Sequence, residues 1–244
     1  MRDHARAAIR AIFSHLGYEI RRSRPDPWCQ RLILERIHAL KPIRLVFDVG
    51  ANEGQSALEF REWFPDARIV SFEPHAPTFA KLRARAHVDP LWDVENLALG
   101  ADAGTRQFHE NAVSGANSLL PTDQQSDALF PDNPHRTQAL TNVSVDRLDA
   151  YCARNGISAI DLLNIDTQGF DLEVLRGCGR FLEPTSTRIV IVEALFVPLY
   201  LRQARFHDIL GLMEEHGYKL YRLIGGHADE RRGLYWSNAL FIAC

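Results

Sequence analysis

The stretch VFDVGANEGQSA, residues 46–57, passes from an apolar strand into a glycine turn and then into a helical pattern. Asp48 lies near the end of the strand, and Gly50 and Gly54 permit a tight turn in which a ligand can approach the backbone closely. The amides that open the following helix would then face this ligand. The stretch therefore predicts a ligand-binding turn between a strand and a helix.

Strands and helices alternate along the rest of the chain. Buried strands are expected at 44–49, 67–73, 92–99, 160–166 and 187–194, and helices at 53–64, 75–87, 146–155, 170–178 and 204–217. This alternation predicts an α/β fold with a mostly parallel sheet covered by helices on both faces. The last two strands, 218–224 and 234–243, have only a short connection and should pair antiparallel. We therefore predict a seven-stranded sheet with six parallel strands and one reversed terminal strand.

The N-terminal part of the chain has a different pattern. Helical periodicity resumes after two prolines and ends before the first strand, which predicts a helical extension over residues 1–42 and a ligand-binding domain over 43–244. Arg2, Arg6 and Arg10 recur every four residues beside apolar side chains. This helix either contacts an anionic membrane surface or packs on the domain or on the sister subunit of a homodimer, and we favour packing.

Composition excludes several classes of function. The formal net charge of −3 and the pI near 6.4 provide no basic stripe for nucleic acid. No apolar run is long enough for a transmembrane helix. The four cysteines lack metal-binding spacing, which indicates a reduced, cytoplasmic chain. The histidines form no HxH or HExxH pattern, so no metal site is expected. His109 and His135 belong to a long polar segment, 105–140, which is either a lid over an acceptor or a tolerated insertion.

Three ligands compete for the glycine turn, against the alternative that it binds nothing. A nucleoside triphosphate site requires a Gly-Lys pair, which the chain lacks. NAD favours a second glycine where Asn52 stands, because a side chain there keeps the backbone away from the pyrophosphate. S-adenosylmethionine has no phosphate, and its carboxylate suits the turn amides while its ammonium suits Asp48 or nearby carbonyls.

An acid at the end of the second strand adds to this site. Glu73 stands 23 residues after Gly50, where a carboxylate accepts hydrogen bonds from ribose hydroxyls in either cofactor. Its alternative role is to favour the dipole of the next helix. Residues at the end of the third strand would lie beside the adenine. The expected cofactor-binding residues are Asp48, Gly50, Asn52, Gly54, Glu73, Asn96, Leu97 and Asp166.

An ordered set of stretches resembles the FkbM family of S-adenosylmethionine-dependent methyltransferases. These stretches are FDVGANEGQSA (47–57), VSFEPHAPTF (70–79), NLALG (96–100), VDRLDAY (145–151), IDLLNIDTQGFDLEVLRG (160–177), IVIVEA (189–194) and SNALF (237–241). The resemblance implies a class I, Rossmann-like methyltransferase fold, S-adenosylmethionine as cofactor and O-methylation, commonly of sugar or polyketide hydroxyls. The family usually has lysine where Asn164 stands and an acid where Gln168 stands, so this chain departs from it at both positions.

Methyl transfer requires mainly that an acceptor oxygen be aligned with the methyl carbon and lose its proton to a base. Asp166 ends the fourth strand and is expected to be this base, a contact to the methionine end of the cofactor, or a helix cap. Glu193 ends the fifth strand and is the second candidate for catalysis, or part of a structural pair. Asp171 and Glu173 are expected to face solvent.

The sequence thus favours a cytoplasmic O-methyltransferase that acts on a small hydroxylated molecule such as a sugar, a glycolipid or a natural product. Two alternatives stay open. One is an NAD(P)-dependent oxidoreductase, against which Asn52 and the terminal antiparallel pair argue. The other is a non-catalytic adapter on the same fold, suggested only by Asn164 and Gln168.

Overall fold

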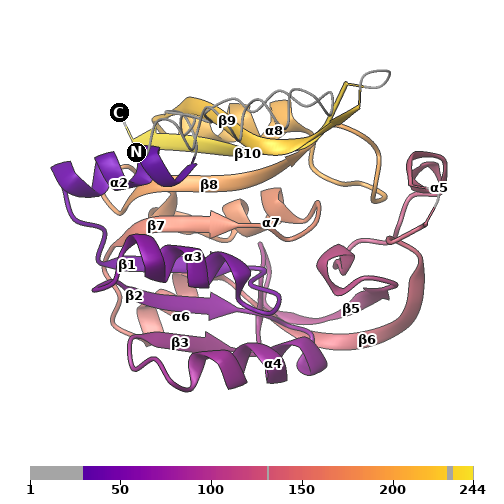
Figure 1. Ribbon diagram of the computed structural model, residues 1–244, viewed down its shortest axis with the longest axis horizontal. Helices are drawn as coiled ribbons and strands as arrows, with labels where there is room; N and C mark the ends of the chain where they lie inside the picture. Colours follow the sequence, from indigo (N-terminus) through magenta and orange to yellow (C-terminus); the bar gives the residue numbers. More distant parts are fainter. Residues whose placement is uncertain (1–29, 131, 230–232, 244) are drawn as a thin grey trace, which may run out of the picture.

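The computed structural model describes residues 30–130, 132–229 and 233–243. Within these ranges, a seven-stranded sheet carries helices on both faces (Figure 1). Its strand order is β3-β2-β1-β7-β8-β10-β9. Strand β10 runs antiparallel to both of its neighbours, and the other strands are parallel to one another. The predicted sheet is therefore confirmed, and the reversed terminal strand lies between β8 and β9.

The strands of this sheet are β1 (Leu45–Val49), β2 (Arg68–Phe72), β3 (Trp92–Glu95), β7 (Ile160–Ile165), β8 (Thr187–Leu195), β9 (Tyr218–Asp229) and β10 (Gly233–Ala243). One face is covered by α2 (Gln30–Leu40), α3 (Gln55–Trp63) and α4 (Ala76–Ala86). The other face is covered by α6 (Leu148–Arg154), α7 (Asp171–Arg176), η2 (Gly179–Leu182) and α8 (Phe206–Glu215).

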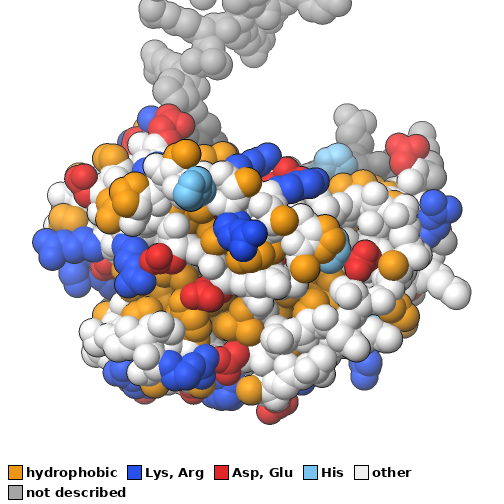
Figure 2. All heavy atoms as spheres, turned by 90° about the horizontal axis from the view of Figure 1, so that it is seen from below, with side chains coloured by type: hydrophobic (Ala, Val, Ile, Leu, Met, Phe, Trp, Pro, Cys, Tyr) orange, Lys and Arg blue, Asp and Glu red, His pale blue; other side chains and the backbone are white. Residues whose placement is uncertain are grey.

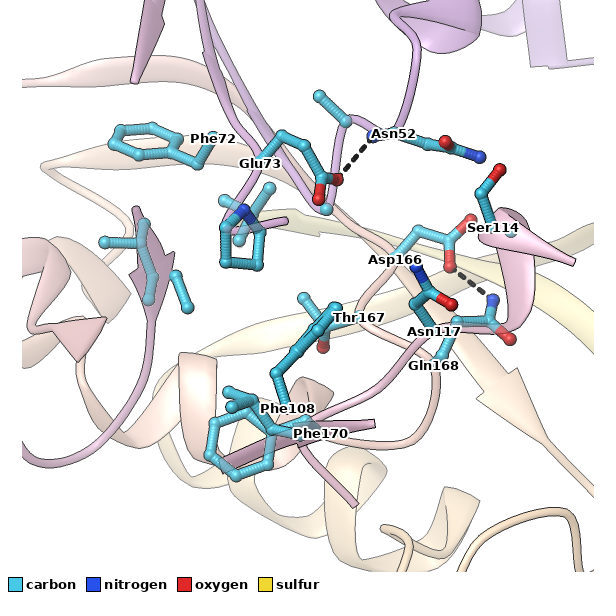
Figure 3. Close-up of a pocket in the computed structure, with 18 of the residues that line it drawn as sticks. Asn52, Phe72, Glu73, Phe108, Ser114, Asn117, Asp166, Thr167, Gln168 and Phe170 are labelled. Carbon is cyan, nitrogen blue, oxygen red and sulfur yellow. Dashed lines mark hydrogen bonds between the residues drawn. The ribbon is translucent and has the colours of Figure 1, made fainter. Parts of the chain in front are cut away.

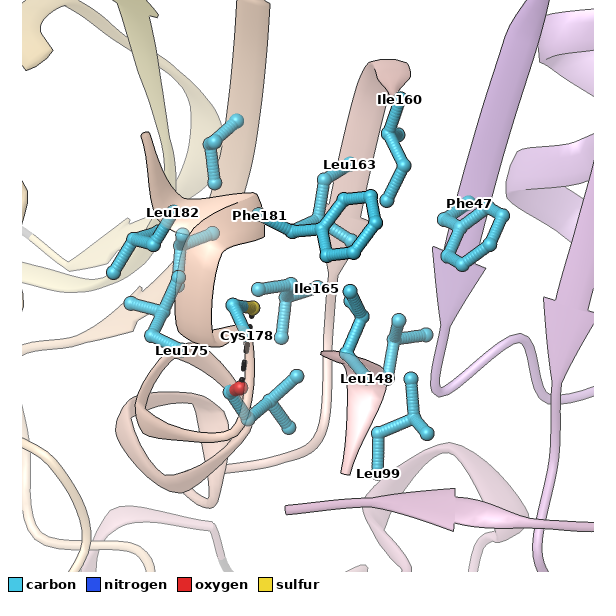
Figure 4. Packing of buried hydrophobic residues seen from close by; sticks show 14 of the residues in the cluster. Phe47, Leu99, Leu148, Ile160, Leu163, Ile165, Leu175, Cys178, Phe181 and Leu182 are labelled. Carbon is cyan, nitrogen blue, oxygen red and sulfur yellow. Dashed lines mark hydrogen bonds between the residues drawn. The ribbon is translucent and has the colours of Figure 1, made fainter. Parts of the chain in front are cut away.

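Alternation along the strands divides the core into two clusters, because successive side chains point to opposite faces. In β1, Val46 packs under α2, α3 and α4, whereas Phe47 packs in the cluster under α6 and α7 (Figure 4). The face under α2–α4 changes from apolar to polar toward the carboxyl ends of the strands. There Asp48 lies in register between Ser71 and Asn164. The site begins at this polar row.

Helix α2 is part of the domain's packing. Ile33 and Leu34 are buried in the same cluster as Phe60 of α3. Residues 30–40 therefore share the core of the domain, although they precede the boundary expected at residue 42. The basic helix expected at the N-terminus lies outside the described residues.

A second sheet forms from the strands that flank the long polar segment. Its strands pair in the order β4-β6-β5 and are β4 (Ala98–Leu99), β5 (Gly104–Asn111) and β6 (Thr137–Asp146). The expected strand 92–99 is consequently wrong as a single strand, since β3 and β4 belong to different sheets. The long β5–β6 pair has a weak apolar signal, because its buried apolar side chains are few: Phe108, Val143 and Val145.

The surface has a mixed charge pattern on the face seen in Figure 2, where lysine and arginine side chains are interspersed with acidic ones. None of the helices in the described ranges combines the length and the apolar character that crossing a bilayer requires.

The segment between β5 and β6 holds two short helices, η1 (Ser114–Ala116) and α5 (Gln125–Leu129).

Gly50 allows the turn after β1 to pack against the end of β7. Its φ of 82° lies in the left-handed region, and its amide and that of Ala51 both donate to the carbonyl of Phe72 at 3.0 Å. A Cβ atom at residue 50 would lie 1.9 Å from the carbonyl oxygen of Asp166. Only glycine therefore permits this approach.

We expect Gly50→Ala to lower the free energy of unfolding by about 3 kcal/mol or more, because it combines left-handed strain with a backbone collision. Gly156→Ala is the matched control: Gly156 has a φ of 64° but no atom within 4 Å of the added Cβ, so strain alone should cost about 1 kcal/mol. Chemical denaturation measures both. Equal losses would contradict the role assigned to the Gly50 contact.

Candidate active site

The carboxyl ends of four neighbouring strands bring polar side chains together on the face under α2–α4. The first row, in register, is Ser71, Asp48 and Asn164. Two residues further along each strand, and so on the same face, stand Glu73, Gly50, Asp166 and Glu193. Residues far apart in the sequence thus meet at one edge of the sheet.

A cleft opens at this edge, with about 850 Å³ of empty space, part of it open to solvent. The turn after β1, the end of β2 and the turn after β7 form its walls, together with the segment around η1. Figure 3 shows Asp166, Gln168, Ser114 and Asn117 gathered at one side of the cleft. Apolar side chains supply much of the remaining wall: Phe72, Leu97, Leu99, Phe108, Leu119 and Phe170.

Glu73 is held at the cleft wall by two backbone amides. One carboxylate oxygen accepts from the amide of Asn52 at 3.0 Å, and the other accepts from the amide of His75 at 2.8 Å. Burial raises the pKa of Glu73 to about 7. Each oxygen keeps a further lone pair, so the carboxylate can also accept hydrogen bonds from the hydroxyls of a ligand.

One polar atom at the cleft wall, the buried Asn52 Oδ1, lacks a partner within the described part of the chain. Asn52 also holds a left-handed φ of 48°, unusual for a residue other than glycine. Because buried polar atoms normally find hydrogen-bond partners, this atom suits a polar ligand in the cleft.

Asp166 lines the cleft, whereas Glu193 does not. Gln168 Nε2 donates to Asp166 Oδ1 and to Glu193 Oε2, each at 2.8 Å. Burial raises the pKa of both carboxyls, and the charge of Asp166 raises that of Glu193 further. The two candidate catalytic acids therefore form one bridged pair, with Asp166 on the cleft side.

Asp48 lies one row below the cleft and does not line it. Asn164 Nδ2 donates to one of its oxygens at 2.9 Å, and Ser71 Oγ donates to the other at 3.4 Å. Burial raises the pKa of Asp48 to about 6. Asn164, at one of the two positions that depart from the family pattern, thus supports this acid with a neutral amide.

Two further expected residues shape the cleft from outside its lining. Gly54 opens α3 with a φ of 92°, and a Cβ atom there would lie 2.8 Å from the ring of Trp92. Asn96 Nδ2 donates to the carbonyls of Glu73 and Pro74, both at 2.9 Å. Their contacts are therefore with protein, whereas the neighbouring Leu97 lines the cleft.

The expectation that Asp171 faces solvent is wrong. Its side chain is buried, and its two oxygens accept from the amides of Thr167 and Gly169, both at 3.0 Å. Burial raises its pKa to about 7. Asp171 therefore caps the turn after β7, one of the roles considered for Asp166. An acid in the first turn of a helix was the available signal.

The segment around η1, which belongs to the 105–140 segment considered above as a lid or an insertion, lines the cleft through Ser114, Gly115, Asn117 and Leu119. Tyr200 Oη donates to the carbonyl of Ala116 at 2.8 Å, and Ser118 Oγ donates to the carbonyl of Gln168 at 2.8 Å. These bonds fix the segment to the turns after β7 and β8. His109 and His135 do not line the cleft. No cluster of metal-binding side chains occurs among the described residues.

The model of the methyltransferase FkbM domain family matches residues 48–220. The chain is 29% identical over 181 residues to the 2-O-methyltransferase NoeI of Sinorhizobium fredii. This match covers 71% of this chain and 72% of NoeI. It is 28% identical over 208 residues to the 31-O-demethyl-FK506 methyltransferase FkbM of Streptomyces tacrolimicus. That match covers 77% of this chain and 73% of the relative.

A solved structure also has this fold. The magnesium protoporphyrin IX methyltransferase ChlM from Synechocystis, solved with bound SAM, matches with a TM-score of 0.50 at 11% identity over 87% of this chain and 76% of that chain. At so low an identity the likeness concerns the fold alone. The predicted class I methyltransferase fold is confirmed.

The raised pKa of Asp48 predicts a pH-dependent stability. The folded state holds the Asp48 proton more tightly than the unfolded chain, so this stabilisation is complete below about pH 4 and is lost as the pH rises through about 6. In Asp48→Asn the amide oxygen can still accept from Asn164. The free energy of unfolding of this variant, relative to that of the wild type, should therefore increase by roughly 2 kcal/mol between pH 4.5 and pH 7.5.

Denaturant unfolding at the two pH values measures this gain. Asp102→Asn serves as the control, because the Asp102 side chain is 81% exposed and its replacement should give no such gain. A difference between Asp48→Asn and the wild type that stays constant with pH would contradict the assignment.

Proposed function

The chain belongs to the FkbM family of S-adenosylmethionine-dependent methyltransferases, and we propose that it methylates a hydroxyl of an uncharged small molecule with Asp166 as the general base. The observation that carries this proposal is the composition of the cleft. Its charged lining residues are Glu73 and Asp166, and none of the described lining residues is lysine or arginine.

This charge balance suits the cofactor. S-adenosylmethionine, when bound, supplies a methyl group on a positively charged sulfonium, which is an excellent leaving group. A nearby cation stabilises the ionised form of a buried carboxylate such as that of Asp166. The sulfonium and the ammonium of the ligand are both cations. The pyrophosphate of NAD(P) would instead add negative charge beside Glu73 and Asp166. The cleft therefore argues against the oxidoreductase alternative.

The wall residues can be matched to parts of the cofactor. Glu73 would accept hydrogen bonds from the ribose hydroxyls, and Leu97 with the nearby aromatic side chains would contact the adenine. The turn that carries Thr167 would lie near the amino-acid end.

The acceptor is inferred from the uncharged polar residues of the cleft. Asn52, Gln55, Ser114 and Asn117 offer amide and hydroxyl groups that recognise neutral hydroxyls. A phosphate or carboxylate would meet no described cation there. The names of both relatives specify an oxygen atom as the position concerned, which supports O-methylation. A sugar, glycolipid or polyketide-like molecule has the required chemistry.

Asp166 is the proposed base because it combines access with a raised pKa. Its carboxylate lines the cleft, and Gln168 occupies one of its oxygens. The other oxygen can accept the proton of an acceptor hydroxyl as the oxygen becomes a nucleophile. A positioned base of this kind contributes typically 10²–10⁴-fold to the rate. Its presence also argues against the non-catalytic adapter.

Location and assembly complete the proposal. We place the enzyme in the cytoplasm, consistent with Cys152 and Cys178, which are both buried free thiols. A homodimer formed through the N-terminal helix stays a prediction.

Glu73→Ala should weaken binding of S-adenosylmethionine by roughly 1–3 kcal/mol, because the ribose hydroxyls lose their acceptor. Isothermal titration calorimetry measures the change. Glu95→Ala is the matched control: Glu95 ends the neighbouring strand and bonds Tyr151 at 2.9 Å, away from the cleft. Unchanged affinity in Glu73→Ala, or an equal loss in both variants, would remove Glu73 from the cofactor site.

Asp166→Asn should lower turnover by about 10²-fold or more while the protein stays folded, because the amide cannot accept the proton. Transfer of isotope-labelled methyl to a panel of neutral and anionic hydroxylated compounds tests the base and the acceptor class together. Glu173→Gln, on the outer side of α7, should keep the wild-type rate. Wild-type turnover in Asp166→Asn would exclude it as the base, and preference for anionic acceptors would overturn the inferred acceptor.

A further inference from the structure

We propose that Gln168 is a positioning residue that makes Asp166 and Glu193 a single proton-sharing pair and sets the pH at which this pair can accept a proton. The inference rests on the proposed function, because it concerns how the base of that reaction is held. It adds a role for Gln168 and for Glu193, neither of which needs to touch the acceptor.

The first observation is the double use of the Gln168 amide group. Its two N–H bonds are directed to the two carboxyls, Asp166 Oδ1 and Glu193 Oε2, each at 2.8 Å. An amide that donates to both groups stabilises negative charge on either of them. It also holds the carboxyls at one fixed separation. In Figure 3 the second oxygen of Asp166 points away from Gln168, which leaves it available to an acceptor.

The second observation is that the two acids favour one orientation of the amide. A flipped amide would direct its oxygen at two carboxyls, and both donations would be lost. The Gln168 Oε1 atom lies 3.0 Å from Tyr200 Oη, which is buried and shares its single proton between this oxygen and the carbonyl of Ala116 at 2.8 Å. The orientation in which Gln168 donates to both acids is therefore compatible with all of its neighbours.

The third observation is that the backbone of Gln168 is held in a strained conformation. Its φ of 54° is left-handed, a conformation that is strained for a residue other than glycine. Bonds on both sides maintain it: Ser118 Oγ donates to the Gln168 carbonyl, and Asp171 accepts from the amides of Thr167 and Gly169. Strain maintained by several contacts is typical of residues that serve a site.

The surroundings of the pair are acidic or neutral on every side. Asp48 faces it from β1, Asp171 from α7 and Tyr200 from the turn after β8. Asn238 of β10 stands opposite Glu193 in register and is uncharged. Asn164 precedes Asp166 on the same face of β7. With no described lysine or arginine among these neighbours, the two N–H bonds of Gln168 are the main groups that favour ionisation of the pair.

The pair would therefore work as follows. At rest it carries one proton, held on Glu193, and Asp166 is ionised. The acceptor hydroxyl would lose its proton to Asp166 as its oxygen bonds to the methyl carbon and the bond between that carbon and the donor sulfur breaks, leaving a neutral thioether, and the pair would then carry two protons. One proton returns to solvent after the product leaves. Weakening the donation by Gln168 should make the resting pair hold its second proton up to a higher pH.

The test compares the pH profiles of kcat/KM in the wild type, Gln168→Glu and Gln168→Met. In Gln168→Glu a third acid replaces the donor, so the acidic limb should move upward by about one pH unit or more, which is a tenfold lower rate at pH values on that limb. Gln168→Met keeps the length of the side chain without its N–H bonds and should move the limb less. Gln107→Glu makes the same chemical change on the exposed surface of β5 and should reproduce the wild-type profile.

A second measurement does not depend on turnover. The ¹³C resonances of the side-chain carboxyls, assigned with Asp166→Asn and Glu193→Gln, report the titration of the pair directly. We expect its midpoint to rise in the order wild type, Gln168→Met, Gln168→Glu. Superimposable titrations, or a loss of rate that is uniform across pH, would overturn the role of Gln168. Shifted titrations in a protein that methylates no acceptor would instead count against the proposed function alone.

Discussion

The structure depends on one electrostatic constraint: acidic side chains are buried at the carboxyl edge of a parallel sheet without a described cation beside them. Asp48, Asp166 and Glu193 stand on adjacent strands and on the same face. Burial raises the pKa of each, so each would ionise more readily beside a positive charge. A cationic cofactor supplies that charge, and an anionic one does not.

The backbone around these acids is built for close approach. Gly50 brings the turn after β1 against the end of β7, and Asp171 caps the turn that carries Gln168. The segment around η1 then covers the cleft through bonds to Tyr200 and Gln168. Neutral amides at Asn164 and Gln168 hold the acids in place. The turns that follow the strands thus position the acidic side chains of the site.

Much of the fold could be predicted from the sequence, because alternating apolar strands and helices leave few possible sheets. Because Glu73 and Asp166 end predicted parallel strands, their position at one edge of the sheet could be predicted as well. Other features depend on tertiary contacts that no local pattern encodes. The burial of Asp171 follows from two amides of a turn, and the β5–β6 pair has too few buried apolar residues for its full length to be predicted. The bridge made by Gln168 requires strands β7 and β8 to be neighbours.

The most direct test of this account is calorimetric titration of the protein with S-adenosylmethionine and, separately, with NAD between pH 5.5 and pH 7.5. A cationic ligand favours ionised carboxyls, so the affinity for S-adenosylmethionine should rise with pH across this range and binding should release protons to the buffer. NAD should not bind. An affinity for S-adenosylmethionine that is independent of pH, or measurable binding of NAD, would contradict the claim that the buried acids are arranged for a cation.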